Sequence, residues 1–186
     1  MKYFRIKEQY FDHIDNKNIG KNIFLYDDNG YLHKIVNSKN TNDETKFIYN
    51  KSGILISMES YINNKRSSYS ILKYSFKIFK RKTLKEMTIF GTDGNITDHY
   101  VYIYQNRKRI ETIHFSIKKQ DKIKYFHKYD GEKRVGTNLQ NGEIYSTREY
   151  DENDLLKSIK TKDGGIVTFL WENGYSNYNY DLYYLS

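Results

Sequence analysis

Cysteine, proline and alanine are absent from the 186 residues of this chain. Without cysteine the fold has no disulfide and no thiolate zinc site, which excludes two common ways of stabilising a small β protein. Stability must therefore come from side-chain packing and sheet hydrogen bonds. No proline-rich or Ser/Gly-rich linker divides the sequence, so we expect a single domain over residues 1–186.

Long apolar runs are also missing. No segment approaches the roughly 20 consecutive apolar residues that span a bilayer as a helix. The first eight residues, MKYFRIKE, lack the apolar core of an export signal. We therefore expect a cytoplasmic protein without a membrane partner.

Four residue types dominate instead: 24 Lys, 21 Ile, 20 Tyr and 18 Asn. Codons for these residues are AT-rich, whereas those for Ala and Pro are GC-rich, so codon bias explains much of the composition. High lysine content then raises the isoelectric point without selection for a polyanionic ligand.

Apolar and aromatic residues alternate with period two in several segments, which predicts β-strands. Tyr100, Tyr102 and Tyr104 form one such set, and Ile113, Phe115 and Ile117 form another. Pairs that favour tight turns separate the segments, among them Asn29-Gly30, Asp93-Gly94 and Asn141-Gly142. Residues 10–22 have a weak helical pattern, and residues 70–87 fit either a bent strand pair or a basic helix.

This pattern predicts an all-β fold, an antiparallel meander of roughly 10–13 strands that forms a large curved sheet built from hairpin repeats. Because both faces of many strands are apolar or aromatic, we favour an open sheet. Its edges would be protected by lysines and by twist rather than by closure.

One turn pattern recurs, in which an aliphatic residue follows an aromatic residue by six positions with Asp, Asn or Gly between them. It occurs in Tyr26–Leu32, Tyr49–Leu55, Phe90–Ile96 and Tyr150–Leu156. These segments resemble the YD repeats of Rhs and related polymorphic-toxin shell proteins, over about half of the chain. Asn50 and Gly91 replace the Asp of that repeat. The resemblance implies a sheet built of hairpins and assigns no catalytic residue, because the repeat itself contains none.

Charge is uneven along the chain. Residues 61–128 hold 16 basic and 5 acidic side chains, a net charge of +11, whereas residues 129–186 hold 6 and 10, a net charge of −4. Basic residues interleaved with aromatic ones are typical of a phosphate-contacting surface. The same pattern also fits solvated strand faces, or pairing of the basic and acidic regions in self-association.

We select a set of candidate partner-binding residues from the basic region and the exposed aromatic positions. The set comprises Lys77, Lys80, Arg81, Lys82, Lys85, Arg107, Lys108, Arg109, Tyr102, Tyr104 and Trp171. Trp171 fits a core position or an interface anchor equally well.

Catalytic patterns are missing. The five histidines are scattered without metal-ligand spacing, and there is no nucleophile elbow, phosphate-binding loop or dinucleotide fingerprint. Asp98-His99 with the basic residues 107–109 could act as the base and phosphate clamp of a nuclease, but no spacing supports this. We expect no catalytic residue, no metal and no cofactor.

The sequence therefore favours a non-enzymatic protein-binding module, of the immunity or antitoxin type, that occludes an acidic, toxin-like protein partner through a sheet face. Two alternatives stay open. One is a protein that binds nucleic acid or another polyanion through the same basic residues. The other is a nuclease-type toxin whose catalytic residues follow no recognised pattern.

Overall fold

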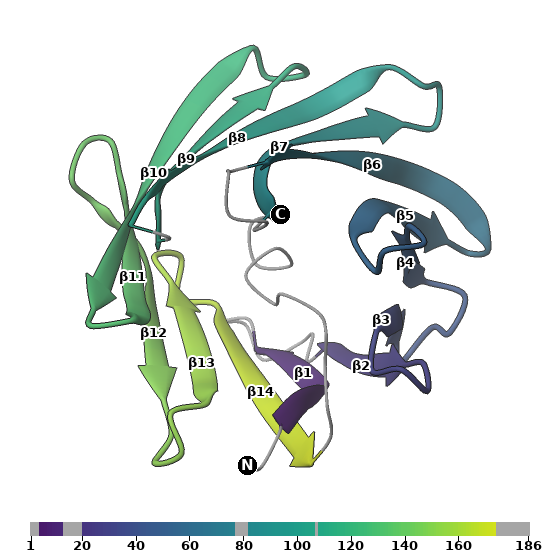
Figure 1. Cartoon of the computed structure of the whole chain (residues 1–186), viewed down its shortest axis with the longest axis horizontal. Coiled ribbons are helices and arrows are strands. Elements are labelled where there is room, and N and C mark those ends of the chain that lie inside the picture. The colour runs from purple at the N-terminus through teal and green to yellow at the C-terminus, as the bar shows by residue number, and fades with distance from the viewer. Residues whose placement is uncertain (1–3, 13–19, 77–81, 107, 174–186) are drawn as a thin grey trace.

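The computed structural model describes residues 4–12, 20–76, 82–106 and 108–173, which form fourteen strands arranged as one closed antiparallel barrel (Figure 1). The strands are β1 (Phe4–Asp12), β2 (Gly20–Tyr26), β3 (Leu32–Asn37), β4 (Glu44–Tyr49), β5 (Leu55–Ile62), β6 (Lys65–Phe76), β7 (Lys82–Gly91), β8 (Ile96–Gln105), β9 (Lys108–Ser116), β10 (Asp121–Asp130), β11 (Lys133–Leu139), β12 (Ile144–Tyr150), β13 (Leu156–Thr161) and β14 (Ile166–Asn173). No helix that could cross a membrane is found in these residues.

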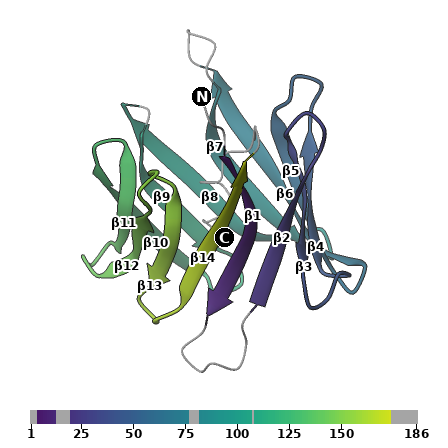
Figure 2. The same cartoon turned by 90° about the horizontal axis from the view of Figure 1, so that it is seen from below.

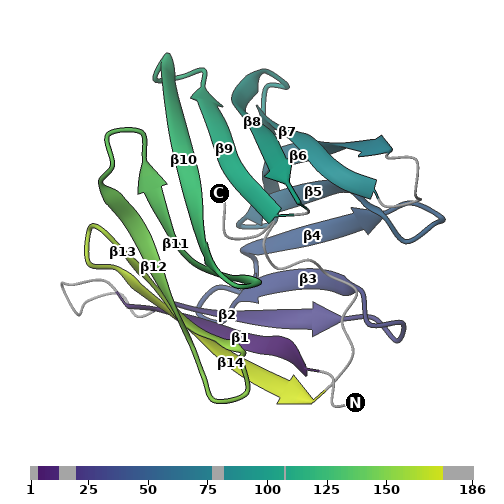
Figure 3. The same ribbon diagram turned by 60° about the vertical axis from the view of Figure 1, so that its left-hand side comes forward.

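The strands lie side by side in chain order around the wall (Figures 2 and 3). The predicted all-β antiparallel meander is confirmed, with fourteen strands against the expected 10–13. Within residues 70–87 the strand-pair alternative is correct, since β6 pairs with β7. In residues 10–22, β1 and β2 flank a segment outside the described residues.

The expectation of open sheet edges is wrong, because β1 pairs with β14 and closes the sheet. Eight residues of β1 have partners on β14, from Phe4 opposite Asn173 to Asp12 opposite Ile166. Closure joins the two ends of the described chain and satisfies edge hydrogen bonds that would otherwise attract other strands. Such a long-range pairing has no local sequence signal.

Alternation along each strand divides the side chains between an inner and an outer wall. Phe24 and Phe47 are buried, whereas their neighbours Leu25 and Ile48 are exposed. The buried residues form one core cluster, which consists of Ile6, Phe24, Leu32, Ile35, Phe47, Leu55, Leu72, Leu84, Met87, Tyr100, Tyr102, Ile159 and Phe169.

An aromatic residue stands near the end of every even-numbered strand, at the same end of the barrel. The seven residues are Tyr26, Tyr49, Tyr74, Tyr104, Tyr129, Tyr150 and Trp171. Each is paired with an inward residue among the first three of the next strand, which we call the start residue, and the register shifts at every one of these pairs. The paired residues are, in the same order, Leu32, Leu55, Leu84, Arg109, Arg134, Leu156 and Ile6. We define a unit as an even-numbered strand together with the strand that its aromatic residue pairs with, from β2–β3 to β14–β1. The barrel is thus a sevenfold repeat of two-strand units.

Six of the seven aromatic residues donate a hydrogen bond to the carbonyl of the corresponding start residue in the preceding unit. The bonds run from Tyr26 to Ile6 (2.8 Å), Tyr49 to Leu32 (3.0 Å), Tyr74 to Leu55 (2.7 Å), Tyr129 to Arg109 (2.9 Å), Tyr150 to Arg134 (2.8 Å) and Trp171 to Leu156 (2.9 Å). Tyr104 occupies the same register position. We call this set the aromatic ring of the barrel.

The residue after the aromatic one shapes the turn. The Asp27 carboxylate accepts hydrogen bonds from the backbone N–H groups of Asn29 (3.0 Å) and Tyr31 (2.8 Å). Asn50 and Asp151 accept the equivalent bonds at their own turns. An amide oxygen replaces a carboxylate here without loss of the bond, which explains why Asn50 preserves the turn.

The segment Phe90–Ile96 has the same backbone hydrogen bonds in its turn but connects β7 to β8, at the opposite end of the barrel. Turns of one shape therefore occur at both ends. The repeat period therefore becomes visible only when the seven aromatic residues are compared with one another and the turns at the opposite end are left out.

A first prediction concerns the aromatic ring. Tyr49→Phe removes the hydroxyl that bonds to the Leu32 carbonyl at 3.0 Å, so we expect the free energy of unfolding to fall by about 1 kcal/mol. Urea denaturation measures the change. Tyr69→Phe is the matched control, because that ring stacks on Phe90 at 4.7 Å on the outer wall and keeps this contact. Equal stabilities of the two variants would contradict a structural role for the ring hydroxyls.

A second prediction concerns alkaline pH. Burial raises the pKa of Tyr74 to about 12, above the value of about 10 of an unfolded tyrosine. The stabilising contribution is therefore complete below pH 10 and is lost as the pH rises towards 12. Denaturation across this range should show a shallower loss of stability in Tyr74→Phe than in the wild type. Parallel curves would refute this assignment.

Candidate functional site

Along β8, β9 and β10 the inner wall holds polar as well as core residues. The inner wall is apolar at Phe24 and Phe47, whereas buried polar residues also occur elsewhere, at Gln9 and Ser70. Along β9 and β10 the buried inward residues include Thr112 and His127. The outward residues Ile103 and Phe126 are apolar and exposed, at 37% and 39% of their surface. Outward apolar residues are also exposed on other strands, as at Leu25 and Ile48.

The outward residues of this region form a continuous surface, which we call the outer apolar face: Val101, Ile103, Ile113, Phe115 and Phe126. Val101 lies opposite Ile113 on the neighbouring strand. Glu111 lies between Ile103 and Phe126, and each of them is its direct partner across a strand pair.

Lysines surround the outer apolar face. The Lys122 ammonium lies 5.4 Å from the centre of the Phe115 ring. Lys124 is paired with Glu111 at 3.6 Å, and Lys128 is exposed further along β10. Lys118 is exposed in the turn between β9 and β10. The face therefore combines an apolar centre with a mainly basic margin.

A chain of buried polar groups occupies the inner wall behind this face. His127 Nε2 lies 2.8 Å from Thr112 Oγ1, and His127 Nδ1 lies 3.1 Å from Thr137 Oγ1. All three residues are buried. Because both ring nitrogens have hydroxyl partners that can donate or accept, the network fixes the orientation of the imidazole.

Two arginines enter the inner wall at the start of β9 and β11. Arg109 and Arg134 are 5% and 4% exposed, and they occupy the start position that holds Ile or Leu in the other five units. The Arg109 guanidinium lies 5.4 Å from the centre of the Tyr102 ring. Arg148 of β12 is half-buried, two positions before Tyr150.

Tyr102 completes this group, which we call the inner polar wall: Tyr102, Arg109, Thr112, His127, Arg134, Thr137 and Arg148. The Tyr102 side chain is 4% exposed, and its hydroxyl has no hydrogen-bond partner within the described residues. Burial raises the pKa of this hydroxyl well above its usual range, so it remains a neutral donor at physiological pH.

The nuclease hypothesis required the side chains of Asp98 and His99 to act together, but in the structure they contact different residues. Asp98 Oδ1 lies 2.7 Å from His114 Nε2, and the His114 ring stacks on Tyr100. His99 Nδ1 instead lies 3.0 Å from Thr88 Oγ1. In the described ranges no three His, Asp or Glu side chains gather as metal ligands would.

The candidate partner-binding residues do not share one surface. Lys77, Lys80, Arg81 and Arg107 lie outside the described residues, and Lys82 begins β7 with its side chain outside them. Lys85 is exposed, and Lys108 pairs with Glu132 at 3.1 Å. Tyr102, Tyr104, Arg109 and Trp171 belong to the inner wall, where Tyr102 is core and Tyr104 and Trp171 pack against it.

Sequence reasoning missed Thr112, His127, Arg134 and Thr137 on the inside, and Phe126 on the outside. The signal that could have found them is the repeat itself. When the units are aligned on the aromatic ring, the position two residues before each ring member reads Phe24, Phe47, Leu72, Tyr102, His127, Arg148 and Phe169. In this series Tyr102, His127 and Arg148 are polar, whereas the other four residues are Phe or Leu. These three consecutive polar residues mark one part of the inner wall.

No family model matches this chain, and a search of curated proteins finds no match. Among solved structures, a porin-like protein from Bacteroides uniformis ATCC 8492 is similar, with 8% sequence identity and a TM-score of 0.58. The match covers 90% of this chain and 98% of that chain, and it shows the fold alone. The structure of TcdB2-TccC3-Cdc42 matches 84% of this chain and 10% of that chain, with 12% identity and a TM-score of 0.33, too low to support any inference.

A third prediction tests the buried network. Thr112→Val preserves the side-chain shape but removes the hydroxyl next to His127 Nε2, so it should lower the free energy of unfolding by about 1–3 kcal/mol. Thr88→Val removes the same kind of hydroxyl–imidazole contact, to His99, at a half-buried site and should cost less. Thermal and urea denaturation of both variants provide the comparison. A loss in Thr88→Val as large as that in Thr112→Val would contradict the buried network.

Proposed function

We propose that this chain is a non-catalytic protein-binding module that contacts an acidic protein partner through the outer apolar face. The observation that supports the proposal is the clustering of outward apolar side chains on the three consecutive strands β8–β10. Burying them against a partner would recover the hydrophobic free energy that the folded barrel alone leaves unused.

The composition of the face suits a protein interface. Apolar residues at the centre exclude water, while charged residues at the margin govern orientation and association rate. Lys118, Lys122 and Lys128 are exposed at the margin, so a partner with acidic residues around an apolar contact would complement it. A closed barrel holds these side chains on a rigid wall, which limits the entropy lost on binding.

Other parts of the outer wall hold ion pairs between neighbouring strands, alongside exposed apolar residues such as Leu25 and Ile48. The ion pairs favour contact with water over contact with lipid. Cross-strand ion pairs join Lys21 to Glu8 (2.8 Å), Lys34 to Glu44 (2.6 Å) and Lys73 to Glu86 (3.6 Å). The Lys34 ammonium, with Lys46, holds the pKa of the Glu44 carboxyl below its usual value. Charged side chains on a lipid-facing strand are destabilising. We therefore retain a water-exposed, cytoplasmic location as part of the proposal.

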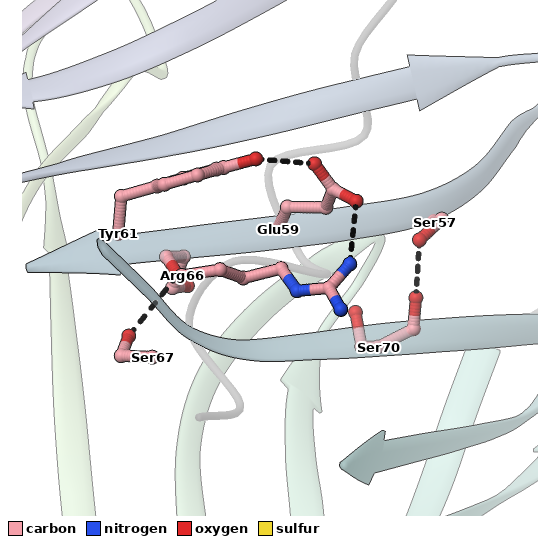
Figure 4. Close-up of polar contacts among 7 residues, drawn as sticks. Ser57, Glu59, Tyr61, Arg66, Ser67 and Ser70 are labelled. Atoms are coloured by element: carbon pink, nitrogen blue, oxygen red, sulfur yellow. Dashed lines mark hydrogen bonds and ion pairs between the residues drawn. The ribbon is translucent and has the colours of Figure 1, made fainter. Parts of the chain in front are cut away.

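The contacts between β5 and β6 show the same character (Figure 4). Tyr61 donates a hydrogen bond to Glu59 at 2.8 Å, and Arg66 donates one to the same carboxylate at 3.4 Å. Here the outward polar groups contact one another. This part of the wall has the polarity expected of a water-facing surface, in contrast to the outer apolar face.

The specific form of the proposal is an immunity or antitoxin role, in which the rigid face occludes a toxin-like partner. It is supported by the basic margin of the outer apolar face. Nucleic acid would bind such a surface mainly through its phosphates. The apolar centre at Ile103 and Phe126 offers phosphates neither a positive charge nor a hydrogen-bond donor, so we take the face to favour a protein.

The fourth prediction tests this face. Ile103→Ser with Phe126→Ser removes two exposed apolar side chains, and we expect the variant to lose its partner while its melting temperature stays close to that of the wild type. Leu25→Ser with Ile48→Ser is the control, because these outer-wall residues are similarly exposed, at 43% and 38%. Tagged wild type and both variants are used for affinity capture from native lysate, with and without nuclease.

A single stoichiometric protein that survives nuclease, binds the wild type and the control, and is lost with the face variant would support the proposal. Equal capture by all three proteins would exclude the outer apolar face. Loss of every bound protein after nuclease would instead indicate a nucleic-acid-binding protein.

A further inference from the structure

We infer that the inner wall of the barrel is the docking surface for a segment of this same chain, residues 174–186. The segment lies outside the described residues, so the support comes from the wall that would receive it and from the sequence of the segment. This docking surface is on the inside of the sheet and does not depend on the partner proposed for the outer apolar face.

The number of strands gives the barrel an interior that the wall alone does not fill. About eight strands enclose a space that inward side chains just fill, whereas roughly 16 to 18 strands enclose a water-filled channel. This barrel has fourteen strands, and its wall is round rather than flattened into two packed layers (Figure 1). Inward side chains of such a wall stay exposed unless something else in the interior covers them.

The inward side chains are nevertheless buried on widely separated strands. Ile6 on β1, Leu32 on β3 and Thr112 on β9 are each 0% exposed, and Met87 on β7 is 2% exposed. In the closed sheet β1 and β7 are separated by β2–β6 on one side and by β8–β14 on the other. Because this burial is found in a single chain, another part of that chain covers the inner wall.

Residues 174–186 are the longest stretch outside the described ranges. The other stretches are residues 1–3, 13–19, 77–81 and 107. β14 ends at Asn173, two residues beyond Trp171 of the aromatic ring, so the segment begins at that end of the barrel. Its thirteen residues exceed the twelve of β6, the longest strand of the wall. An extended segment of this length reaches about 45 Å and can run the full length of the interior.

The composition of the segment fits a buried location. Its sequence, GYSNYNYDLYYLS, contains five tyrosines and two leucines but no lysine or arginine. Tyrosine buries a large apolar ring and also brings a hydroxyl that can bond to buried polar groups. The inner wall offers both an apolar core and polar groups such as Gln9 and Thr112. Segments that remain in water are usually poor in aromatic residues.

The charges of the wall and the segment are complementary. The buried charged residues of the described inner wall are Arg109 and Arg134. A buried guanidinium is costly unless an acidic group or a hydrogen-bond acceptor meets it. The single charged residue of the segment is Asp181, and its asparagine and tyrosine side chains supply further acceptors. The segment therefore brings acceptors to the arginines and adds no cation.

The test uses the full chain and exploits its lack of cysteine. Tyr180→Cys places a single thiol in the middle of the segment, and its reaction with a maleimide is timed in buffer and in denaturing urea. We expect the reaction in buffer to be slower by about tenfold or more, because a docked segment shields the thiol. Ser52→Cys is the matched control, since this exposed turn residue should react at similar rates in both solvents.

A second comparison measures stability and covers the case in which cysteine itself displaces the segment. Tyr178→Lys with Tyr180→Lys would bring two cations towards the inward arginines, so the melting temperature should fall by several degrees. Leu25→Lys with Ile48→Lys makes equivalent changes at exposed outer-wall positions and should shift it less.

Equal reaction rates of Tyr180→Cys in buffer and in urea would overturn the inference. An unchanged melting temperature in Tyr178→Lys with Tyr180→Lys would do the same. Protection that increases with protein concentration would show that the segment enters a second copy rather than its own barrel, and would also overturn it. None of these results bears on the outer apolar face, which the capture experiment tests.

Discussion

The hydrogen bond from an aromatic side chain to the backbone of the preceding two-strand unit is the constraint on which this barrel depends. Each ring member, such as Tyr49, is bound on both sides: its backbone pairs with Leu55 on the next strand, and its hydroxyl bonds to Leu32 on the previous one. A strand held on both sides cannot slip by one residue, and such a slip would exchange its inner and outer side chains. Repetition of this bond around the wall specifies which side chains face inwards.

Because the ring fixes the backbone, the remaining inward positions can vary in polarity while the fold is preserved. Most units use this freedom to build an apolar core. The units from β8 to β12 use it to place His127, Arg134 and their neighbours inside. Chemistry is thus confined to departures from the repeat, which is where a regular scaffold is expected to hold its functional groups.

The sequence predicted the local elements well and their closure poorly. Turn residues and the alternation of Tyr100, Tyr102 and Tyr104 indicated strands and hairpins because both signals act over a few residues. Pairing of β1 with β14 has no such signal. Alternation also could not tell which face is inside, so the inward direction of Arg109 was missed and its charge was assigned to a surface. The repeat period of 21 to 30 residues between ring members was hidden by similar turns at both ends.

Trp171 is the single tryptophan of the chain, and it replaces tyrosine at the position where the ring closes. Its backbone pairs with Ile6 across the seam between β14 and β1, and its indole N–H bonds to the Leu156 carbonyl. The single indole fluorophore of the protein thus lies where the first and last strands meet. Its emission wavelength would report on water entering that seam, so the joining of the barrel can be followed optically and separately from the folding of individual hairpins.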